Sequence, residues 1–231
     1  MQILNANTKE KQQALESNSY FSDLNPKILF EIIEGLRLSR FERGETIFWE
    51  ADECAGLHMI RSGSVKLYKI SPQGRELVIR VLGEGATFNE VPVFDHKPNP
   101  VNVAAVEVSE IWIVEPGVIR RCIREYPEMA QSVISNLCQN LRMLLGTVEE
   151  LSFYQVTIRL ARLIRQLPVE QLEGAREERL TQDALAARLG TVREVVARSL
   201  RELERSGAIQ VQRGQIKVMD RDRLQEWMSV E

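Results

Sequence analysis

Charged side chains recur at helical spacing near the carboxyl end of the chain. At steps of i, i+4, i+7 and i+11 along one predicted helix stand Glu194, Arg198, Arg201 and Arg205. This spacing places them on one outward helical face, and Arg193 lies at the edge of that face. Arginine can form two hydrogen bonds to O6 and N7 of guanine, and glutamate can accept one from cytosine N4. The face could therefore read base pairs, or it could be only the solvated side of an ordinary helix.

Two predicted helices joined by a glycine position this charged face. Thr181 can cap the first helix with its hydroxyl, and Gly190 is expected to end it, because glycine adopts left-handed backbone angles without strain. The second helix is predicted from about Val192 to just before Gly207. The apolar positions that would pack the pair together are Leu185, Ala186, Leu189, Val196, Leu200 and Leu203. An ordinary hairpin of two helices has the same pattern, so the pair alone leaves both interpretations open.

A predicted β-hairpin follows the second helix. Residues 208–211 and 215–219 are short strand-like runs on either side of Arg213-Gly214, which would form the turn. Helix, turn, helix and wing in this order predict a winged helix-turn-helix domain that binds double-stranded DNA.

The net charge of −3 is unevenly distributed over the 231 residues. From Val156 onward there are 14 Lys and Arg residues against 12 Asp and Glu, and within 181–219 there are seven against four. Local charge is what meets the phosphate groups of DNA, so the acidic total is only a weak objection to DNA binding.

Several features bear on the location of the protein. No apolar run approaches the about 20 residues that a membrane span needs, and the amino-terminal MQILNANTKEKQQ lacks the apolar core of a signal peptide. Cys54, Cys122 and Cys138 are odd in number and widely spaced, which indicates neither a disulfide framework nor a structural zinc site. We expect a cytoplasmic protein with no membrane contact and no bound cofactor.

The hydrophobic period indicates a β-rich region in the first half of the chain. Residues 9–38 are predicted to form short helices, with Pro26 at a helix start. From Arg40 the period changes to two, and short β-branched runs alternate with turns that contain glycine. The predicted strands are 46–49, 57–60, 65–70, 76–82, 101–108 and 110–114. This arrangement is typical of a sandwich, a barrel or a jelly-roll-like β-roll.

A long helix is predicted from Pro127 to about Ser152, after a short one over 118–125. Its apolar residues, which step by four or three, are Met129, Val133, Leu137, Leu141, Leu144, Val148 and Leu151. The pattern is close to a coiled-coil seam and predicts a homodimer, although the helix could instead pack only against its own β-roll. A dimer favours DNA sites with two-fold symmetry.

These elements predict an α+β protein in three parts. A β-roll effector or sensor domain is expected over 1–126, a dimerisation helix and hinge over 127–155, and the winged helix-turn-helix domain over 156–231. Within the last part, a helix is predicted over 156–167 and a polar connection over 168–179.

This order of parts resembles the Crp/Fnr family of bacterial transcription regulators, from about Phe21 to Asp220. The likeness is carried by RGETI at 43–47, IRSGSVK at 60–66, GATFNE at 85–90 and TQDALAARLGTVREVVARSLRELE at 181–204. The last stretch is highly specific, and the β-roll glycines are moderately so. One departure is Ala51, where the family usually has glycine.

The resemblance implies particular DNA contacts. The family positions that read bases match Arg193, Glu194 and Arg198, as in cyclic-AMP-type members, whereas the Fnr type has a serine where this chain has Ala197. This arrangement implies an inverted pair of TGTGA-like half-sites rather than TTGAT. The positions expected to contact phosphates are Thr181, Arg201, Arg205 and Arg213. The resemblance also implies contact with RNA polymerase.

The resemblance does not extend to the cyclic AMP pocket. In members that bind cyclic AMP, Gly-Glu and Arg-Ser pairs hold the ribose and phosphate, and a Thr-Ser pair reads adenine. Here Glu90 matches the glutamate, but the other positions hold Asn89, Pro100, Val101, Leu144 and Leu145. Proline cannot replace a guanidinium, and an unpartnered Glu90 would repel the phosphate. We expect the effector not to be cyclic AMP.

Other effector classes of the family stay open, and they include haem and small organic molecules, so an unknown small-molecule effector is one of the alternatives. The iron–sulfur branch needs an amino-terminal cysteine group, and no cysteine precedes Cys54. His58 lies on a predicted strand, which favours a satisfied or solvated histidine over a haem ligand. The protein could be a constitutive regulator with a degenerate pocket, or it could respond to haem, redox state or nitric oxide.

The cysteines and histidines of the sequence favour neither redox nor metal chemistry. Cys122 and Cys138 lie on predicted helices and are expected to be packing residues rather than redox switches. A cupin-type enzyme would need a metal-ligand cluster, and a chain with only two histidines, 38 residues apart, lacks the usual set. We therefore predict no enzymatic activity.

Overall fold

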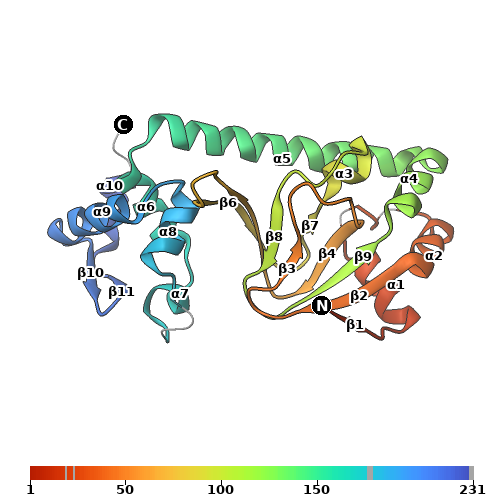
Figure 1. Ribbon diagram of the computed structural model, residues 1–231, viewed down its shortest axis with the longest axis horizontal. Coiled ribbons are helices and arrows are strands. Elements are labelled where there is room, and N and C mark those ends of the chain that lie inside the picture. Colours follow the sequence, from red (N-terminus) through yellow and green to blue (C-terminus); the bar gives the residue numbers. More distant parts are fainter. Residues whose placement is uncertain (19, 23, 176–178, 229–231) are drawn as a thin grey trace. The chain divides into compact units, whose positions relative to one another are not determined.

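The computed structural model describes residues 1–18, 20–22, 24–175 and 179–228 (Figure 1). The chain divides into two units with separate hydrophobic cores. The first unit contains Met1–Lys69 and Ile79–Arg142, and the second contains Ile70–Val78 and Met143–Glu231.

Two sheets form the β-roll that was predicted for the first half of the chain. In spatial order, the larger sheet contains β1 (Gln2–Leu4), β2 (Leu36–Phe41), β9 (Ser109–Val114), β4 (Leu57–Ser62) and β7 (Thr87–Phe88). The smaller sheet contains β3 (Thr46–Phe48), β8 (Asn102–Ala105), β5 (Val65–Ile70) and β6 (Glu76–Leu82). Strand β9 pairs antiparallel with β2 and β4, and β8 pairs antiparallel with β3 and β5.

Successive side chains of the larger sheet enter two different cores, because a strand alternates its faces. Ile111 joins a cluster shared with the smaller sheet, whereas Trp112 joins the cluster on the opposite face. The cluster between the sheets consists of Phe41, Phe48, Ile60, Val65, Leu82, Phe88, Val103, Ala105 and Ile111. Gly63 closes the β4–β5 turn at φ +83°, where a Cβ would lie 2.4 Å from the carbonyl oxygen of Val108, so a larger residue would not fit.

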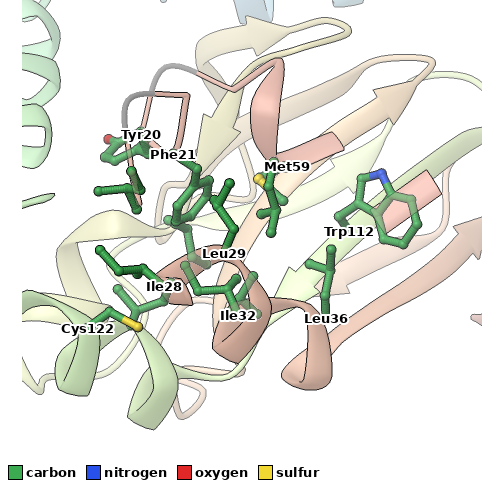
Figure 2. Packing of buried hydrophobic residues seen from close by; sticks show 14 of the residues in the cluster. Tyr20, Phe21, Ile28, Leu29, Ile32, Leu36, Met59, Trp112 and Cys122 are labelled. Atoms are coloured by element: carbon green, nitrogen blue, oxygen red, sulfur yellow. The ribbon is translucent and has the colours of Figure 1, made fainter. Parts of the chain in front are cut away.

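Three helices cover the outer face of the larger sheet: α1 (Thr8–Glu16), α2 (Pro26–Gly35) and α4 (Pro116–Glu125). Asn25 caps α2 by accepting a hydrogen bond from the Lys27 backbone, and Pro26 occupies the first turn. Figure 2 shows part of this core, in which Ile28, Ile32 and Cys122 of the helices belong to the same cluster as Met59 and Trp112 of the sheet. Cys122 is therefore a packing residue, as predicted.

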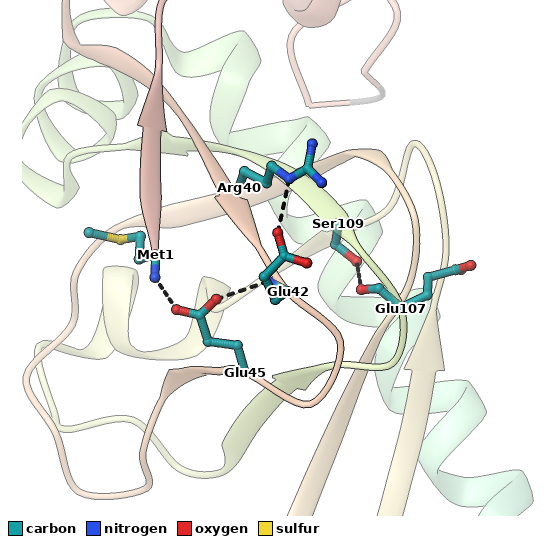
Figure 3. A network of polar contacts seen from close by, with 6 residues as sticks. All are labelled: Met1, Arg40, Glu42, Glu45, Glu107 and Ser109. Atoms are coloured by element: carbon teal, nitrogen blue, oxygen red, sulfur yellow. Dashed lines mark hydrogen bonds and ion pairs between the residues drawn. The ribbon is translucent and has the colours of Figure 1, made fainter. Parts of the chain in front are cut away.

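Polar contacts hold the turn between β2 and β3 (Figure 3). The Glu45 carboxylate accepts a hydrogen bond from the backbone N–H of Glu42 at 2.9 Å and pairs with the amino group of Met1. The pairing with the amino terminus lowers the pKa of Glu45. In the turn before β9, the Ser109 hydroxyl lies 2.9 Å from the carbonyl oxygen of Glu107. Of these contacts, the pairing of Met1 with Glu45 ties the amino terminus to the turn between β2 and β3.

The structure corrects several predicted boundaries in the first unit. The helical prediction for 9–38 is wrong at its end, because α2 stops at Gly35 and Leu36 begins β2, with Leu36 and Leu38 buried and Arg37 exposed between them. The predicted strand over 101–108 is reduced to β8. Helix α3 (Glu90–Asp95) and the short strands β1 and β7 were not predicted.

A single helix, α5 (Pro127–Phe153), matches the predicted long helix. The second unit then contains α6 (Val156–Gln166), α7 (Val169–Glu173), α8 (Gln182–Leu189), α9 (Arg193–Arg205), β10 (Ile209–Gln212), β11 (Gln215–Val218) and α10 (Arg221–Met228). Helices α7 and α10 were not predicted. Residues 176–178, within the predicted connection over 168–179, lie outside the described residues.

The core of the second unit packs α6, α8 and α9 against the β10–β11 hairpin. Its buried residues are Leu160, Ala161, Ile164, Leu172, Leu185, Ala186, Leu189, Val196, Leu200, Leu203, Ala208, Ile209, Ile216 and Leu224. Every apolar position predicted to pack the two helices together belongs to this set. The second unit is thus the predicted winged helix-turn-helix fold.

Candidate nucleic-acid interface and effector pocket

The turn between α8 and α9 has the local geometry that its sequence predicts. The Thr181 hydroxyl accepts a hydrogen bond from the backbone N–H of Ala184 at 3.1 Å and so caps α8. Gly190 ends the helix at φ +62°, with its N–H donating to the carbonyl oxygen of Ala186. The first turn of a helix leaves backbone N–H groups without intrahelical partners and carries the positive end of the helix dipole, and both favour an anion.

Helix α9 has one buried face and one exposed face. Its buried residues are Val196, Ser199, Leu200 and Leu203. The exposed residues include every member of the predicted charged face: Arg193, Glu194, Arg198, Arg201 and Arg205. Within the described residues, the side chains of Arg193, Glu194 and Arg198 hold no hydrogen bond or ion pair. Their donors and acceptors are available to a partner.

The hairpin of β10 and β11 places a further arginine beside the two helices. Arg213 and Gly214 take φ angles of +50° and +78°, the two left-handed residues that a tight hairpin turn of this type requires. The Arg179 guanidinium donates to the carbonyl oxygen of Arg213 at 3.0 Å. Arg179, Arg193 and Arg213 line one cleft of about 550 Å³ together with Thr181.

Arg179 was not singled out from the sequence. It precedes the Thr181 cap by two residues, and a basic residue just before a predicted helix start was the available signal. Its hydrogen bond to the turn of a hairpin 34 residues further along the chain had no local signal.

In the effector region, Asn89 is suited to the position where family members have glycine. Its φ angle is +73°, in the left-handed region that asparagine tolerates better than most residues. Its side-chain amide donates to the carbonyl oxygen of Gly56 at 3.0 Å and lies 3.6 Å from the Sγ atom of Cys54. The substitution therefore keeps the backbone geometry and adds contacts inside the chain.

The expectation of an unpartnered Glu90 is wrong. The Glu90 side chain is buried, and its Oε1 atom accepts a hydrogen bond from the Tyr20 hydroxyl at 3.0 Å. Burial and the nearby Glu90 charge both raise the pKa of Tyr20 above its usual range, so the phenol keeps its proton for this contact. Tyr20 belongs to the buried cluster of the first unit (Figure 2). The two residues are 70 positions apart, so sequence spacing could not pair them.

The positions that match the Arg-Ser and Thr-Ser pairs offer no cation. Pro100 is exposed and Val101 is half-buried, while Leu144 and Leu145 are exposed on α5 in the second unit. Arg120 of α4 does reach the region around α3. Its guanidinium, however, donates to the backbone carbonyl oxygens of Val93 at 2.6 Å and Pro92 at 3.1 Å.

The loop that follows α3 is bonded to the turn after β3. Asn99 is buried, and its side-chain amide donates to the carbonyl oxygen of Trp49 at 3.3 Å. Ala51, which departs from the family's glycine, sits at φ +69° and donates its N–H to the Asn99 carbonyl oxygen. Alanine is strained at this angle, where glycine is not. The Asn99 Oδ1 atom is buried without a hydrogen-bond partner in the described chain.

His58 is a core residue. Its imidazole is 1% exposed, lies 4.9 Å from the Phe88 ring centre in a stacked arrangement, and places Nδ1 2.9 Å from the Gly56 carbonyl oxygen. Burial lowers the pKa of His58 to about 4. The prediction of a satisfied histidine is confirmed. Over the described residues, no group of three or more His, Cys, Asp or Glu side chains could hold a metal ion.

The predicted dimer seam divides into two halves. Met129 and Val133 are buried, and Leu137 packs against the same core of the first unit. The remaining members, which are exposed, are Leu141, Leu144, Val148 and Leu151. The prediction that Cys138 is a packing residue is wrong for the described chain, because its side chain is exposed on this helix. No described helix is both long and apolar enough to span a bilayer.

Known proteins share both units. Residues 38–126 match the family model of the cyclic nucleotide-binding domain, and residues 158–227 match that of the Crp-like helix-turn-helix domain. The CRP-like cAMP-activated global transcriptional regulator of Mycobacterium tuberculosis (strain ATCC 25618 / H37Rv) is 28% identical over 213 residues, which cover 88% of this chain and 93% of that protein. The cyclic AMP receptor protein of Thermus thermophilus is 29% identical, with coverage of 83% and 90%.

Solved structures agree on the fold. A transcriptional regulator of the Crp/Fnr family from Eubacterium rectale matches with a TM-score of 0.80 at 21% identity, covering 92% of this chain and 100% of that chain. The catabolite activator protein of Thermus thermophilus matches with a TM-score of 0.52 at 26% identity, covering 91% and 98%. These relatives are transcription regulators rather than enzymes.

Proposed function

The chain belongs to the Crp/Fnr family of transcription regulators and carries the family's helix-turn-helix DNA-binding domain, and from this premise we propose that it binds a palindromic DNA site as a homodimer. The proposal rests above all on one observation. The side of α9 opposite its buried residues exposes Arg193, Glu194 and Arg198, and no described side chain neutralises them.

These three residues read the base pairs. Arg193 and Arg198 each supply the paired donors that match O6 and N7 of guanine, and Glu194 accepts from N4 of cytosine. Two guanine contacts and one cytosine contact fit a TGTGA-like half-site better than TTGAT. The inverted copy of the half-site meets the second subunit.

A second set of residues binds the phosphate backbone. The capped start of α8 at Thr181 offers backbone N–H groups, and Arg213 stands at the turn of the hairpin. Arg201 and Arg205 extend the exposed face of α9. The Nε atom of Arg201 bonds to the Ala197 carbonyl oxygen, which leaves its other guanidinium donors for phosphate.

The exposed half of the seam on α5 forms the dimer interface. Leu141, Leu144, Val148 and Leu151 follow each other at spacings of three and four, and all four are exposed in the single chain. A second copy of the same helix would bury them in a two-fold arrangement. Val133 and Leu137, which were also predicted to lie in this interface, pack against the core of the first unit instead.

The effector is not cyclic AMP, although two relatives carry that ligand in their names. The support comes from the residues at the positions that bind cyclic AMP in other family members. Pro100 and Val101 supply no guanidinium, and Glu90 is already bonded to Tyr20. A constitutive regulator with a degenerate pocket is the second candidate, and a regulator that responds to haem, redox state or nitric oxide is the third.

The parts over 1–126, 127–155 and 156–231 act as sensor, dimerisation helix and DNA-binding domain. Chromosomal DNA and RNA polymerase as partners imply work in the cytoplasm.

Selection from random duplexes with the purified protein tests this function. We expect enrichment of inverted TGTGA-like half-sites about one helical turn apart. Enrichment of TTGAT half-sites would contradict the roles of Arg193, Glu194 and Arg198. Enrichment of single, unpaired half-sites would contradict the dimer.

A further inference from the structure

A buried polar cluster joins the start of α6 to the inner side of α9. The Oγ1 atom of Thr157 lies 2.9 Å from the Oγ atom of Ser199 and 2.7 Å from the Oε2 atom of Glu202. Thr157 is 6% exposed and Ser199 is 2% exposed. Glu202 is half-buried. The neighbouring buried residues of the two helices, which include Leu160, Val196 and Leu203, are apolar.

The proton positions in this cluster follow from its chemistry. A threonine hydroxyl has one proton and an ionised carboxylate has none, so Thr157 donates to Glu202. The same oxygen then accepts the proton of the Ser199 hydroxyl. Ser199, Thr157 and Glu202 thus form a directed chain that ends on a charge, and hydrogen bonds to charged groups are the stronger kind.

The cluster is placed where it can control the rotation of α9 about its axis. Ser199 and Glu202 are three residues apart and therefore share one side of the helix. Arg193 and Glu194 project on the exposed side. Apolar contacts are non-directional and allow a helix to rotate slightly, whereas a satisfied polar network defines one arrangement.

We propose that Thr157 is a positioning residue for the recognition helix. Its hydroxyl holds Ser199 and Glu202 and so fixes the direction in which Arg193, Glu194 and Arg198 project. This inference rests on the proposed base-reading function of α9. It differs from a purely stabilising role, because it requires that loss of the hydroxyl alters sequence discrimination in protein that stays folded.

The first test needs no DNA. Thr157→Val removes the hydroxyl at nearly constant volume, Thr157→Ser restores it, and Thr46→Val makes the same change on β3 of the other unit as a control. Amide hydrogen exchange is measured over 193–205 in the full-length protein. We expect exchange there to rise about tenfold in Thr157→Val, to stay near the wild-type rate in Thr157→Ser and to be unaffected by Thr46→Val. Unchanged exchange in Thr157→Val would overturn the proposal, whatever site the protein binds.

The second test uses the duplex that the wild-type protein selects and a scrambled duplex of equal length. We expect Thr157→Val to lower the ratio of selected to scrambled affinity by about tenfold at constant salt slope, and Thr157→Ser to restore it. Ser199→Ala should lower the ratio too, and the double variant should lose less than the two single losses combined. Arg193→Ala serves as the reference for lost base reading.

The outcomes separate the two proposals. If Arg193→Ala loses discrimination and folded Thr157→Val keeps it, α9 reads bases and the positioning role is wrong. If Arg193→Ala and the wild-type protein discriminate equally, the proposed base reading is wrong, and the positioning role fails with it.

Discussion

On the outer side of α9, Arg193, Glu194 and Arg198 are exposed and hold no side-chain partner within the described residues. Around α3 the polar side chains are used differently. Asn89 is bonded to a backbone carbonyl, and Glu90 accepts the hydroxyl of Tyr20. Both regions carry residues that match functional positions of the family. Only the outer side of α9 leaves those residues available. A residue that matches a functional position of the family therefore indicates a binding site only where its donors and acceptors have no partner inside the chain.

The difference has a physical basis. A buried polar group without a partner costs about 1–3 kcal/mol, so the internal hydrogen bonds of Asn89 and Glu90 stabilise the free protein. An exposed arginine is solvated and has no such cost. A recognition surface can therefore stay open in the free protein, whereas the buried side chains of Asn89 and Glu90 are satisfied by internal hydrogen bonds.

The largest expected effect on the open surface of α9 is loss of the dimer that would present two copies of it to DNA. Leu141→Glu places a charge in the exposed half of the seam, and we expect a monomer whose affinity for the selected palindrome falls by about a hundredfold or more, because two linked half-sites become one. Gln139→Glu adds the same charge on another side of α5 and should leave the dimer intact. Sedimentation and fluorescence anisotropy measure both. A Leu141→Glu protein that remains dimeric would place the interface elsewhere.

The next effect is a pH dependence of stability that comes from the buried His58 in the first unit. The folded-state pKa of His58 is lowered to about 4, so below pH 6.5 the unfolded chain takes up a proton that the folded chain excludes. Stability from this source is present above pH 6.5 and is lost as the pH falls to 4, by about 3 kcal/mol. Denaturant unfolding across this range measures it. His58→Gln should remove this part of the pH dependence, and His96→Gln, at an exposed position, should not. Equal curves for wild type and His58→Gln would contradict the assignment.

The open side of the comparison predicts two distinct arginine effects. Arg193→Ala or Arg198→Ala should cost about 1–3 kcal/mol on the selected site and relax preference at one base pair. Arg213→Ala should instead weaken binding to all duplexes alike and reduce the salt dependence by about one charge. Anisotropy titrations at several salt concentrations distinguish the two. If Arg193→Ala weakened binding to all duplexes equally, Arg193 would be a phosphate contact, and this result would contradict its role in base reading.

The sequence predicted these regions unequally because their signals have different ranges. The Thr181 cap, the Gly190 turn and the period of α9 depend on residues a few positions apart, and the structure confirms each of them. The Tyr20–Glu90 and Arg179–Arg213 contacts join residues 70 and 34 positions apart. No local pattern encodes such contacts.

The apolar period of α5 illustrates a second limit. Val133 and Leu141 are equivalent in spacing and chemistry, yet Val133 is 5% exposed and Leu141 is 58% exposed in the single chain. A period shows which residues share a face of a helix. It does not show whether the chain itself or a second copy covers that face, because this depends on which elements fold back against each part of the helix.

The smallest expected effect is the response to cyclic AMP, for which we predict no saturable heat in calorimetric titration below about 1 mM. Two features could cause this result: the missing cation at Pro100, and the bond between Glu90 and Tyr20. Tyr20→Phe separates them, because it frees the carboxylate without adding a cation. It should cost about 1 kcal/mol of stability and still bind no cyclic AMP, since a freed carboxylate repels the phosphate. Micromolar binding by Tyr20→Phe alone would mean that Tyr20 closes a working pocket. Micromolar binding by the wild-type protein would mean that another residue supplies the phosphate contact, and the effector region would then be as open as α9.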